Sequence, residues 1–480
     1  MSITSLSFLL FVCVVVIAAN LVTSAQHRQW VLAAANLAFI GSQVSQPQAL
    51  LPLLIFVALG YAALFWLRRG SVWRLGTCLL LTIAAFVVLK RFAFLDGRFE
   101  LPFIYLTMGL SYVLFRLIHL MVDAQAGELP AGISPLRYFN YSCNFLCFVS
   151  GPIQRFQDFE ADAARPLALD EATVFRAFSR VVAGFVKVVV FSAALNYVFT
   201  QFSAPLLTSE ALAGMKLTAS LSAAAVFYTL YLYFNFSGYM DIVIGVGGLL
   251  GQTLPENFRA PFGARNFLDF WTRWHITLSE WFRTYLFNPL LKALAGRFGS
   301  AGLMPWLGIL SFFVTFLVMG LWHGTTAVFV AYGLLLGFGA AANKLWQLIM
   351  TRRLGKAGYR ALAERPDYRY LCRGATFAYF ALALVCLWVD LAQLTWLLGT
   401  LGVFGIAGSF ALIALGSALA MLAWDVARTV LRDLGATLIH PTGGASGFVV
   451  RNLFLAAQVL FILMAASFFH KAPEFVYRAF

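Results

Sequence analysis

Residues 298–343 form an uninterrupted stretch of 46 residues without Asp, Glu, Lys or Arg. A stretch of this length is long enough for two membrane-spanning helices, because about 20 apolar residues cross a bilayer. Its only side chain that changes charge near neutral pH is His323. Ionisable groups at membrane depth are costly and usually face protein or a water-filled cavity. His323 is therefore the first candidate functional residue.

The composition is that of a polytopic membrane protein, since 61% of the 480 residues are hydrophobic and only 11% are charged. Residues 31–67 and 391–424 also carry no charge. We predict an all-α, polytopic transmembrane protein with about eleven spans, forming a single integral membrane domain over residues 1–480. Several apolar segments are shorter than a span and predict re-entrant or broken helices around a central chamber.

The basic residues predict how the chain is oriented. Its net charge is +14, which in a membrane protein indicates cytoplasmic loops and anionic lipid headgroups, and we expect no nucleic acid partner. Residues 351–373, with seven Arg or Lys against two acids, are predicted to be a basic cytoplasmic loop. The six cysteines show no paired metal-ligand spacing, and we predict neither a disulfide nor a metal site.

The densest mixture of aromatic and charged residues lies at 269–285, which we interpret as one helix. Asp269 and Arg273 are four residues apart and can pair, and His275, Ser279 and Arg283 repeat with the same spacing on one face. Three large rings accompany them: Trp274, Trp281 and Tyr285. This pattern is typical of a helix that enters a buried polar chamber, and also of an interfacial amphipathic helix with an aromatic belt.

Three further motifs carry polar groups into apolar surroundings. In Gly320-Leu-Trp-His-Gly324 the glycines permit close backbone approach. His323 either acts as a general base or forms a hydrogen bond between helices that only stabilises their packing. Asn235-Phe-Ser-Gly-Tyr-Met-Asp241 places an acid in the otherwise uncharged stretch 217–255, and we expect a partner for it. Ser150-Gly-Pro-Ile-Gln-Arg-Phe156 is a helix-ending turn followed by charge.

Taken together, these four motifs resemble the membrane-bound O-acyltransferase family. Along the chain they follow in the order 150–156, 235–241, 269–285 and 320–324. The resemblance covers about half of the chain, residues 101–339, which we expect to be the catalytic core. Within the family the chain is most similar to the bacterial branch that modifies polysaccharides, with alginate O-acetyltransferases and teichoic acid D-alanyl transfer proteins. The stretch Pro289–Leu294 stands where the alginate enzymes usually have a Gly-Gly-Asn turn, whereas Ser150–Arg155 leans toward the D-alanyl proteins.

The resemblance implies acyl transfer at membrane depth in the bacterial inner membrane. Acetyl-CoA or an acyl carrier protein would be the cytoplasmic donor, with no tightly bound cofactor, and a separate extracytoplasmic acyltransferase would be a partner. His323 would be the general base, and His275 would orient the acceptor or polarise the thioester. We expect the following residues to bind substrate: Trp274, Ser279, Arg283, Trp322, Asn235 and Asp241.

Two other classes of function remain open from the sequence. A transporter would use the buried histidines and Asp241 to relay protons, although transporters commonly show internal repeats and none is recognisable here. A scaffold subunit would use the histidines only for packing. Within acyl transfer, D-alanyl transfer from a carrier protein to a cell-envelope acceptor is the alternative to acetyl transfer.

Overall fold

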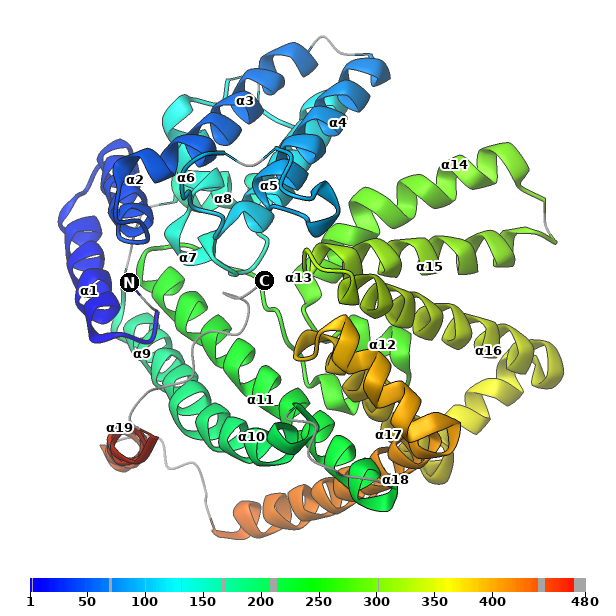
Figure 1. The fold of residues 1–480 in the computed structure, drawn as a ribbon. Coiled ribbons are helices and arrows are strands. Elements are labelled where there is room, and N and C mark those ends of the chain that lie inside the picture. The colour runs from blue at the N-terminus through cyan, green and yellow to red at the C-terminus, as the bar shows by residue number, and fades with distance from the viewer. Residues whose placement is uncertain are drawn as a thin grey trace. The chain divides into compact units, whose positions relative to one another are not determined.

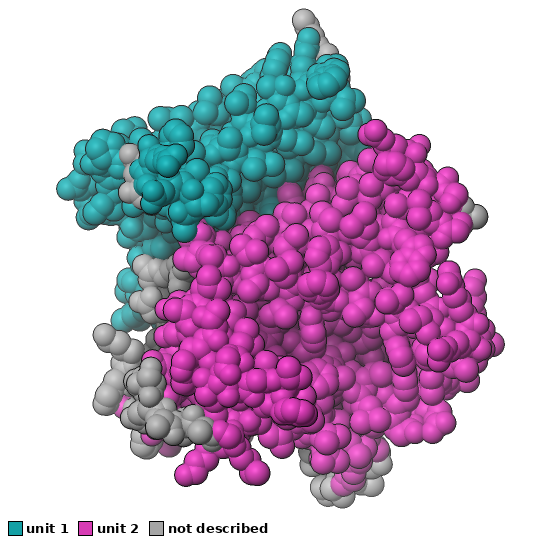
Figure 2. All heavy atoms as spheres, turned by 45° about the vertical axis from the view of Figure 1, so that its right-hand side comes forward, with its two compact units in different colours: residues 1–187, 236–256, 474–480 teal, residues 188–235, 257–473 magenta. Residues whose placement is uncertain are grey.

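The computed structural model describes residues 1, 3–68, 71–99, 101–130, 132–165, 167, 169–207, 214–300, 302–438 and 445–469, with side chains omitted at 431–451 and 468–469. These residues are helical or in turns and loops, and the part of the chain described contains no β-strand, as predicted. The chain divides into two compact units, coloured separately in Figure 2. Among the described residues, unit 1 holds those within 1–187 and 236–256, and unit 2 holds those within 188–235 and 257–469.

Unit 1 is built from helices of very different lengths (Figure 1). They are α1 (Leu6–Leu21), α2 (Ala25–Gly41), α3 (Leu51–Leu67), α4 (Val72–Leu89), α5 (Leu110–Ala126), α6 (Pro135–Ser142), α7 (Phe145–Phe148), α8 (Phe156–Ala164), α9 (Glu171–Phe185) and the second part of α11 (Gly214–Leu249). The 3₁₀ turns Pro47–Leu50 and Ala93–Leu95 connect them. The short helices α6 and α7 are largely buried, as predicted for broken helices that end inside protein.

Unit 2 contains the long helices of the C-terminal half. They are α10 (Ala193–Leu207), the first part of α11, α12 (Phe267–Trp271), α13 (Ile276–Phe282), α14 (Asn288–Phe298), α15 (Met304–Trp322), α16 (Val328–Glu364), α17 (Pro366–Ala383), α18 (Leu391–Leu438) and α19 (Ala445–Phe469). Short 3₁₀ turns lie at Pro261–Gly263 and Leu384–Leu387, and π-helical turns at Val186–Ser192 and Arg283–Phe287. Figure 1 shows α15 packed along α16, and α17 along α18.

Eight helices among the described residues are long and apolar enough to cross a membrane, and α1 and α19 contain shorter apolar segments. The protein is therefore a multi-pass membrane protein, and the count of about eleven spans stays a prediction. Residues 351–373, predicted to be a basic cytoplasmic loop, are largely helical: α16 continues to Glu364 through a kink at Gly355, and α17 begins at Pro366. Their side of the membrane stays a prediction. The basic excess predicts a side of the membrane, but Ala, Leu, Arg and Lys are also strong helix formers.

Two buried polar side chains of unit 1, Arg116 and His119, have hydrogen-bond partners within the same unit. Arg116, only 2% exposed, donates to the backbone carbonyls of Ser142 and Cys147 at 2.9 and 2.8 Å. The Nε2 of His119 accepts the Phe156 N–H at 3.0 Å, so its proton lies on Nδ1, which faces Asp123. Burial lowers the pKa of His119.

Asp241 has the partners that an acid at membrane depth requires. Its carboxylate binds Lys187, and it binds Arg180 at 3.1 Å. Arg180 also forms a two-pronged contact with Glu256 at 2.6 Å. Asp241 is thus one member of a network of two acids and two bases in unit 1, and its expected partner is confirmed.

Glycines set the packing of α15 on α16. A Cβ added at Gly320 would collide with the backbone of Gly333, and one added at Gly333 would lie close to the carbonyl oxygen of Leu317. Small residues permit such close helix crossings in membranes, where packing rather than the hydrophobic effect drives helix association. The close approach predicted for Gly320 is therefore confirmed.

We expect Gly333→Val to destabilise this hairpin strongly, because the new side chain meets backbone atoms that cannot move aside. Overpacking typically costs about 1–3 kcal/mol. Gly308→Val in α15 is the control, since a Cβ there meets nothing within 4 Å. The midpoint of thermal unfolding and the yield of monodisperse protein should fall for Gly333→Val only, and equal values for the two variants would contradict the prediction.

Candidate active site

The central motif is two short helices separated by a break. The helix predicted over 269–285 is wrong as a single element: α12 ends at Trp271, and α13 begins at Ile276. Between them His275 adopts left-handed backbone angles, φ 46° and ψ 53°. A non-glycine residue in this region costs about 1–3 kcal/mol and persists only when its surroundings hold it there.

Asn257 provides the contacts that hold His275 in this conformation. Its side-chain Oδ1 accepts the backbone N–H of Thr277 at 3.0 Å and the hydroxyl of Thr277 at 2.9 Å. These donors identify that atom as the amide oxygen, so the Nδ1 of His275, 3.3 Å away, is a donor to it. The backbone oxygen of Asn257 accepts the Ile276 N–H at 3.0 Å. The lone pair of the His275 imidazole therefore lies on Nε2.

His323 ends α15 and has the same tautomer for a different reason. Its Nδ1 lies 2.6 Å from the backbone oxygen of Met319, one turn earlier in the helix. A carbonyl oxygen only accepts, so Nδ1 carries the proton and Nε2 the lone pair. The ring is 3% exposed and packs edge-on against Trp322 and Tyr332, with centroids 4.9 and 5.3 Å away.

The two histidines belong to one buried site in unit 2. His275 is 1% exposed and His323 is 3% exposed. Both rings are oriented through Nδ1. This arrangement can supply a base and a second polar ring next to each other, away from water.

Trp274 is a packing residue in the structure. Its ring is 2% exposed and lies among five aromatic rings, at centroid distances of 5.0 to 6.4 Å: Tyr233, Phe258, Phe262, Phe270 and Phe380. Phe258 and Trp274 also form an isolated antiparallel bridge. Trp274 therefore fixes the backbone immediately before His275 to the rest of unit 2.

A cavity of about 420 Å³ adjoins the histidines. Its wall includes Met319, whose carbonyl contacts His323, and Ile276, which follows His275 in the sequence. Polar residues also line it: Arg259, Thr272, Ser279, Glu280, Arg283 and Thr315. Ser279 and Arg283 thus share one cavity, as their spacing predicted. Neither histidine lines the cavity directly. The predicted pair of Asp269 and Arg273 is confirmed, with Nε of Arg273 3.1 Å from Oδ1 of Asp269.

The remaining predicted site residues lie elsewhere. Asn235 is buried in unit 2 and donates to the hydroxyl of Ser192 at 3.2 Å. Trp322 contacts His323, whereas Asp241 belongs to the charge network of unit 1. Neither Asn235 nor Asp241 lines the 420 Å³ cavity.

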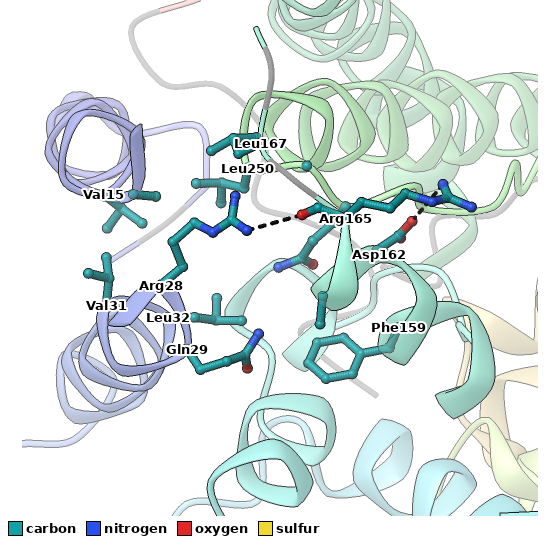
Figure 3. Close-up of a pocket in the computed structure, with 14 residues that line it drawn as sticks. Val15, Arg28, Gln29, Val31, Leu32, Phe159, Asp162, Arg165, Leu167 and Leu250 are labelled. Atoms are coloured by element: carbon teal, nitrogen blue, oxygen red, sulfur yellow. Dashed lines mark hydrogen bonds and ion pairs between the residues drawn. The ribbon is translucent and has the colours of Figure 1, made fainter. Parts of the chain in front are cut away.

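Unit 1 has a small cavity of its own, of about 60 Å³ (Figure 3). In Figure 3 Arg28 reaches the backbone oxygen of Arg165 at 3.0 Å, and Arg165 contacts Asp162. This volume holds a few water molecules at most, since each needs about 10–15 Å³. It is far too small for an acyl donor.

Sequence reasoning missed Asn257 and the carbonyl of Met319. Asn257 lies in Pro255-Glu-Asn-Phe-Arg-Ala-Pro261, which indicated only a boundary before the central motif. An asparagine between prolines is an ordinary turn signal, and no spacing connects it to a histidine 18 residues later. A backbone oxygen leaves no signal in a sequence at all.

The fold and this site define a polytopic membrane protein with a buried histidine pair beside a cavity. The sequence model of the membrane-bound O-acyltransferase family matches residues 37–363, and the chain belongs to this family. The matched region contains both histidines and every predicted site residue.

Curated relatives cover part of the chain. A teichoic acid D-alanyltransferase of Bacillus subtilis is 30% identical over 229 residues, 47% of this chain and 56% of that protein. A probable alginate O-acetylase of Pseudomonas putida is 30% identical over 258 residues, 54% and 48% of the two chains. A peptidoglycan O-acetyltransferase of Helicobacter pylori is 38% identical over 119 residues, 25% and 21%. The chain spans about half the length of the first two relatives.

We expect His275→Gly to be more stable than His275→Ala, reversing the usual effect of glycine. Both changes remove the imidazole, but only alanine keeps a Cβ in left-handed backbone, which costs about 1–2 kcal/mol. Unfolding of the two purified variants in denaturant would measure the difference. Greater stability of His275→Ala would show that the left-handed conformation is not under strain.

We expect Asp269→Asn to reduce stability by about 1–2 kcal/mol, because it weakens charge-assisted hydrogen bonds to a partly buried partner. The carboxylate also accepts the Arg265 N–H at 2.8 Å at the start of α12. Glu280→Gln is the control, since Glu280 is exposed and lies 4.0 Å from Arg283. Equal unfolding midpoints for the two variants would contradict a structural role for Asp269.

Proposed function

We propose that the protein is an O-acyltransferase that moves an acyl group, most simply acetyl, from a thioester to a hydroxyl. The observation that carries the proposal is the hydrogen bond from Nδ1 of His323 to Met319, which puts the imidazole lone pair on Nε2. A general base works best when its lone pair is held in one orientation, and the burial of His323 together with its hydrogen bond to Met319 supports this role. Membership of the family and the names of the relatives support the same reaction.

In the proposed reaction, Nε2 of His323 takes the proton of the acceptor hydroxyl as its oxygen attacks the thioester carbonyl. A tetrahedral oxyanion forms, its C–S bond breaks, and the thiolate leaves and recovers the proton from the imidazolium. His275 orients the acceptor or polarises the carbonyl, and its neutral tautomer is set by Asn257. Exclusion of water protects the thioester from hydrolysis and strengthens each hydrogen bond to the oxyanion.

The lining of the 420 Å³ cavity supports a role for Ser279 and Arg283 in substrate binding. The planar guanidinium of Arg283 is suited to an anionic group of the donor or acceptor. Trp322, whose ring packs against His323, and Trp274, which precedes His275 in the sequence, are proposed to act by positioning the two histidines. Contributions of Asn235 and Asp241 to substrate binding are also part of the proposal, although their observed contacts are to Ser192 and to the unit 1 charge network.

The proposed setting is the bacterial inner membrane, with acetyl-CoA or an acyl carrier protein as the cytoplasmic donor. The acceptor is a hydroxyl of a cell-surface or exported polysaccharide, reached with the help of an extracytoplasmic acyltransferase partner. The alternative is D-alanyl transfer from a carrier protein, which the match to the Bacillus subtilis D-alanyltransferase favours. The two reactions use different acyl groups from different donors, so the donor that supports transfer separates them.

We expect His323→Ala to reduce acyl transfer by about 10²–10⁴-fold, the usual contribution of a general base, with normal insertion and yield. His27→Ala is the control, because His27 is exposed on α2. Transfer of labelled acyl to membranes would be measured with acetyl-CoA and, separately, with D-alanyl carrier protein. Near-normal transfer by His323→Ala would exclude the general-base role, and transfer with the carrier protein alone would select the alternative.

A further inference from the structure

A cavity of about 770 Å³ in unit 2 lies along α18 and is separate from the proposed substrate cavity. We call it the α18 groove. It is formed by α11, the Pro261–Gly263 turn, α17 and α18, and its walls are mostly apolar, for example Leu230, Phe377, Ile413 and Met421. The proposed function uses none of the residues that line it.

The α18 groove opens toward the surroundings of the protein. Two of its lining residues, Leu412 and Trp424, are 54% and 65% exposed. Of the residues in the most apolar part of the α18 span, only 17% are buried inside the protein. Because the surroundings of a spanning helix are hydrocarbon, an apolar groove on such a helix faces lipid chains.

One end of the groove is charged. Nη1 of Arg373 lies 2.7 Å from Oδ2 of Asp425, which also accepts the hydroxyl of Tyr370 at 3.0 Å. Arg428, one turn of α18 further on, forms no ion pair within the described part of the chain and also lines the groove. The two arginines outnumber the single acid. Arg428 lies just after the charge-free stretch 391–424 of α18, where a span is expected to meet the headgroup layer, and Arg373, the eighth residue of α17, lines the same groove.

We propose that the α18 groove binds one anionic phospholipid, with an acyl chain on the apolar walls and the phosphate at Arg373 and Arg428. A long apolar wall with a cationic end matches an amphiphile that has one anionic headgroup. A nucleotide carrier fits poorly, because its base and several phosphates would meet hydrocarbon walls and the carboxylate of Asp425.

The bound lipid contacts the packing that surrounds the candidate active site. Tyr233 and Phe262 line the groove, and their rings lie 6.1 and 6.4 Å from the ring of Trp274. A chain in the groove covers the outer side of these two rings. The lipid therefore stabilises unit 2, and this inference does not depend on the proposed acyl transfer.

The test is lipid binding by the full chain in neutral detergent, with phosphatidylglycerol or phosphatidylcholine as the probe and native mass spectrometry as the readout. Gly416→Phe places a ring inside the groove, where a Cβ meets nothing within 4 Å. Gly399→Phe, in the part of α18 before its kink at Gly402, also adds a ring in open space but lies outside the groove. We expect Gly416→Phe alone to lose bound phosphatidylglycerol.

The charge is tested with Arg428→Gln and the control Arg352→Gln, which removes an exposed arginine from α16. We expect the preference for phosphatidylglycerol over phosphatidylcholine to fall by about fivefold in Arg428→Gln only, as for one basic residue near an anionic surface. This variant needs no new packing, so it decides the question even if Gly416→Phe does not fold. Equal lipid retention by the two phenylalanine variants, or no preference for the anionic lipid in the unmodified protein, would overturn the proposal.

Discussion

The amide oxygen of Asn257 is the interaction on which the geometry of the candidate site depends. It is buried and accepts two donors from Thr277 and one from His275. The seven residues of α13 are too few for a stable isolated helix, so its first turn needs partners from outside the helix. Without Asn257, buried N–H groups would lose their acceptor in a place that water does not reach, which costs about 1–3 kcal/mol for each group.

The two histidines are oriented by different kinds of hydrogen-bond acceptor. Their orientations therefore differ in how easily substitutions elsewhere disturb them. The acceptor of His323 is a backbone oxygen of its own helix, so the orientation persists as long as the last turn of α15 is formed. The acceptor of His275 is a side chain from another segment. Its backbone conformation is also strained, and such strain is commonly found at functional sites. His275 is thus the part of the site that substitutions elsewhere disturb more easily.

Sequence patterns predicted the features that arise from local chemistry. The charge-free stretch 298–343 holds α15 and the apolar part of α16, Gly320 lies at their crossing, and the spacing of Asp269 and Arg273 gives their ion pair. The break before α13 could not be predicted in this way, because residues 272–275 contain neither glycine nor proline. The contacts that impose the break come from Asn257, and a distant side chain can override a helical pattern that its own segment supports.

The aromatic residues around Trp274 follow from the same physical setting. Lipid chains are as apolar as leucine, so burial of apolar surface alone does not hold transmembrane helices together. Close ring packing and buried hydrogen bonds must do so, and Trp274 connects α11 through Tyr233 to α17 through Phe380. The residue after it, His275, therefore inherits its position from helices that face lipid on their other sides. A lipid bound in the proposed α18 groove would act on the same rings, which makes the bilayer itself a contributor to the position of His275.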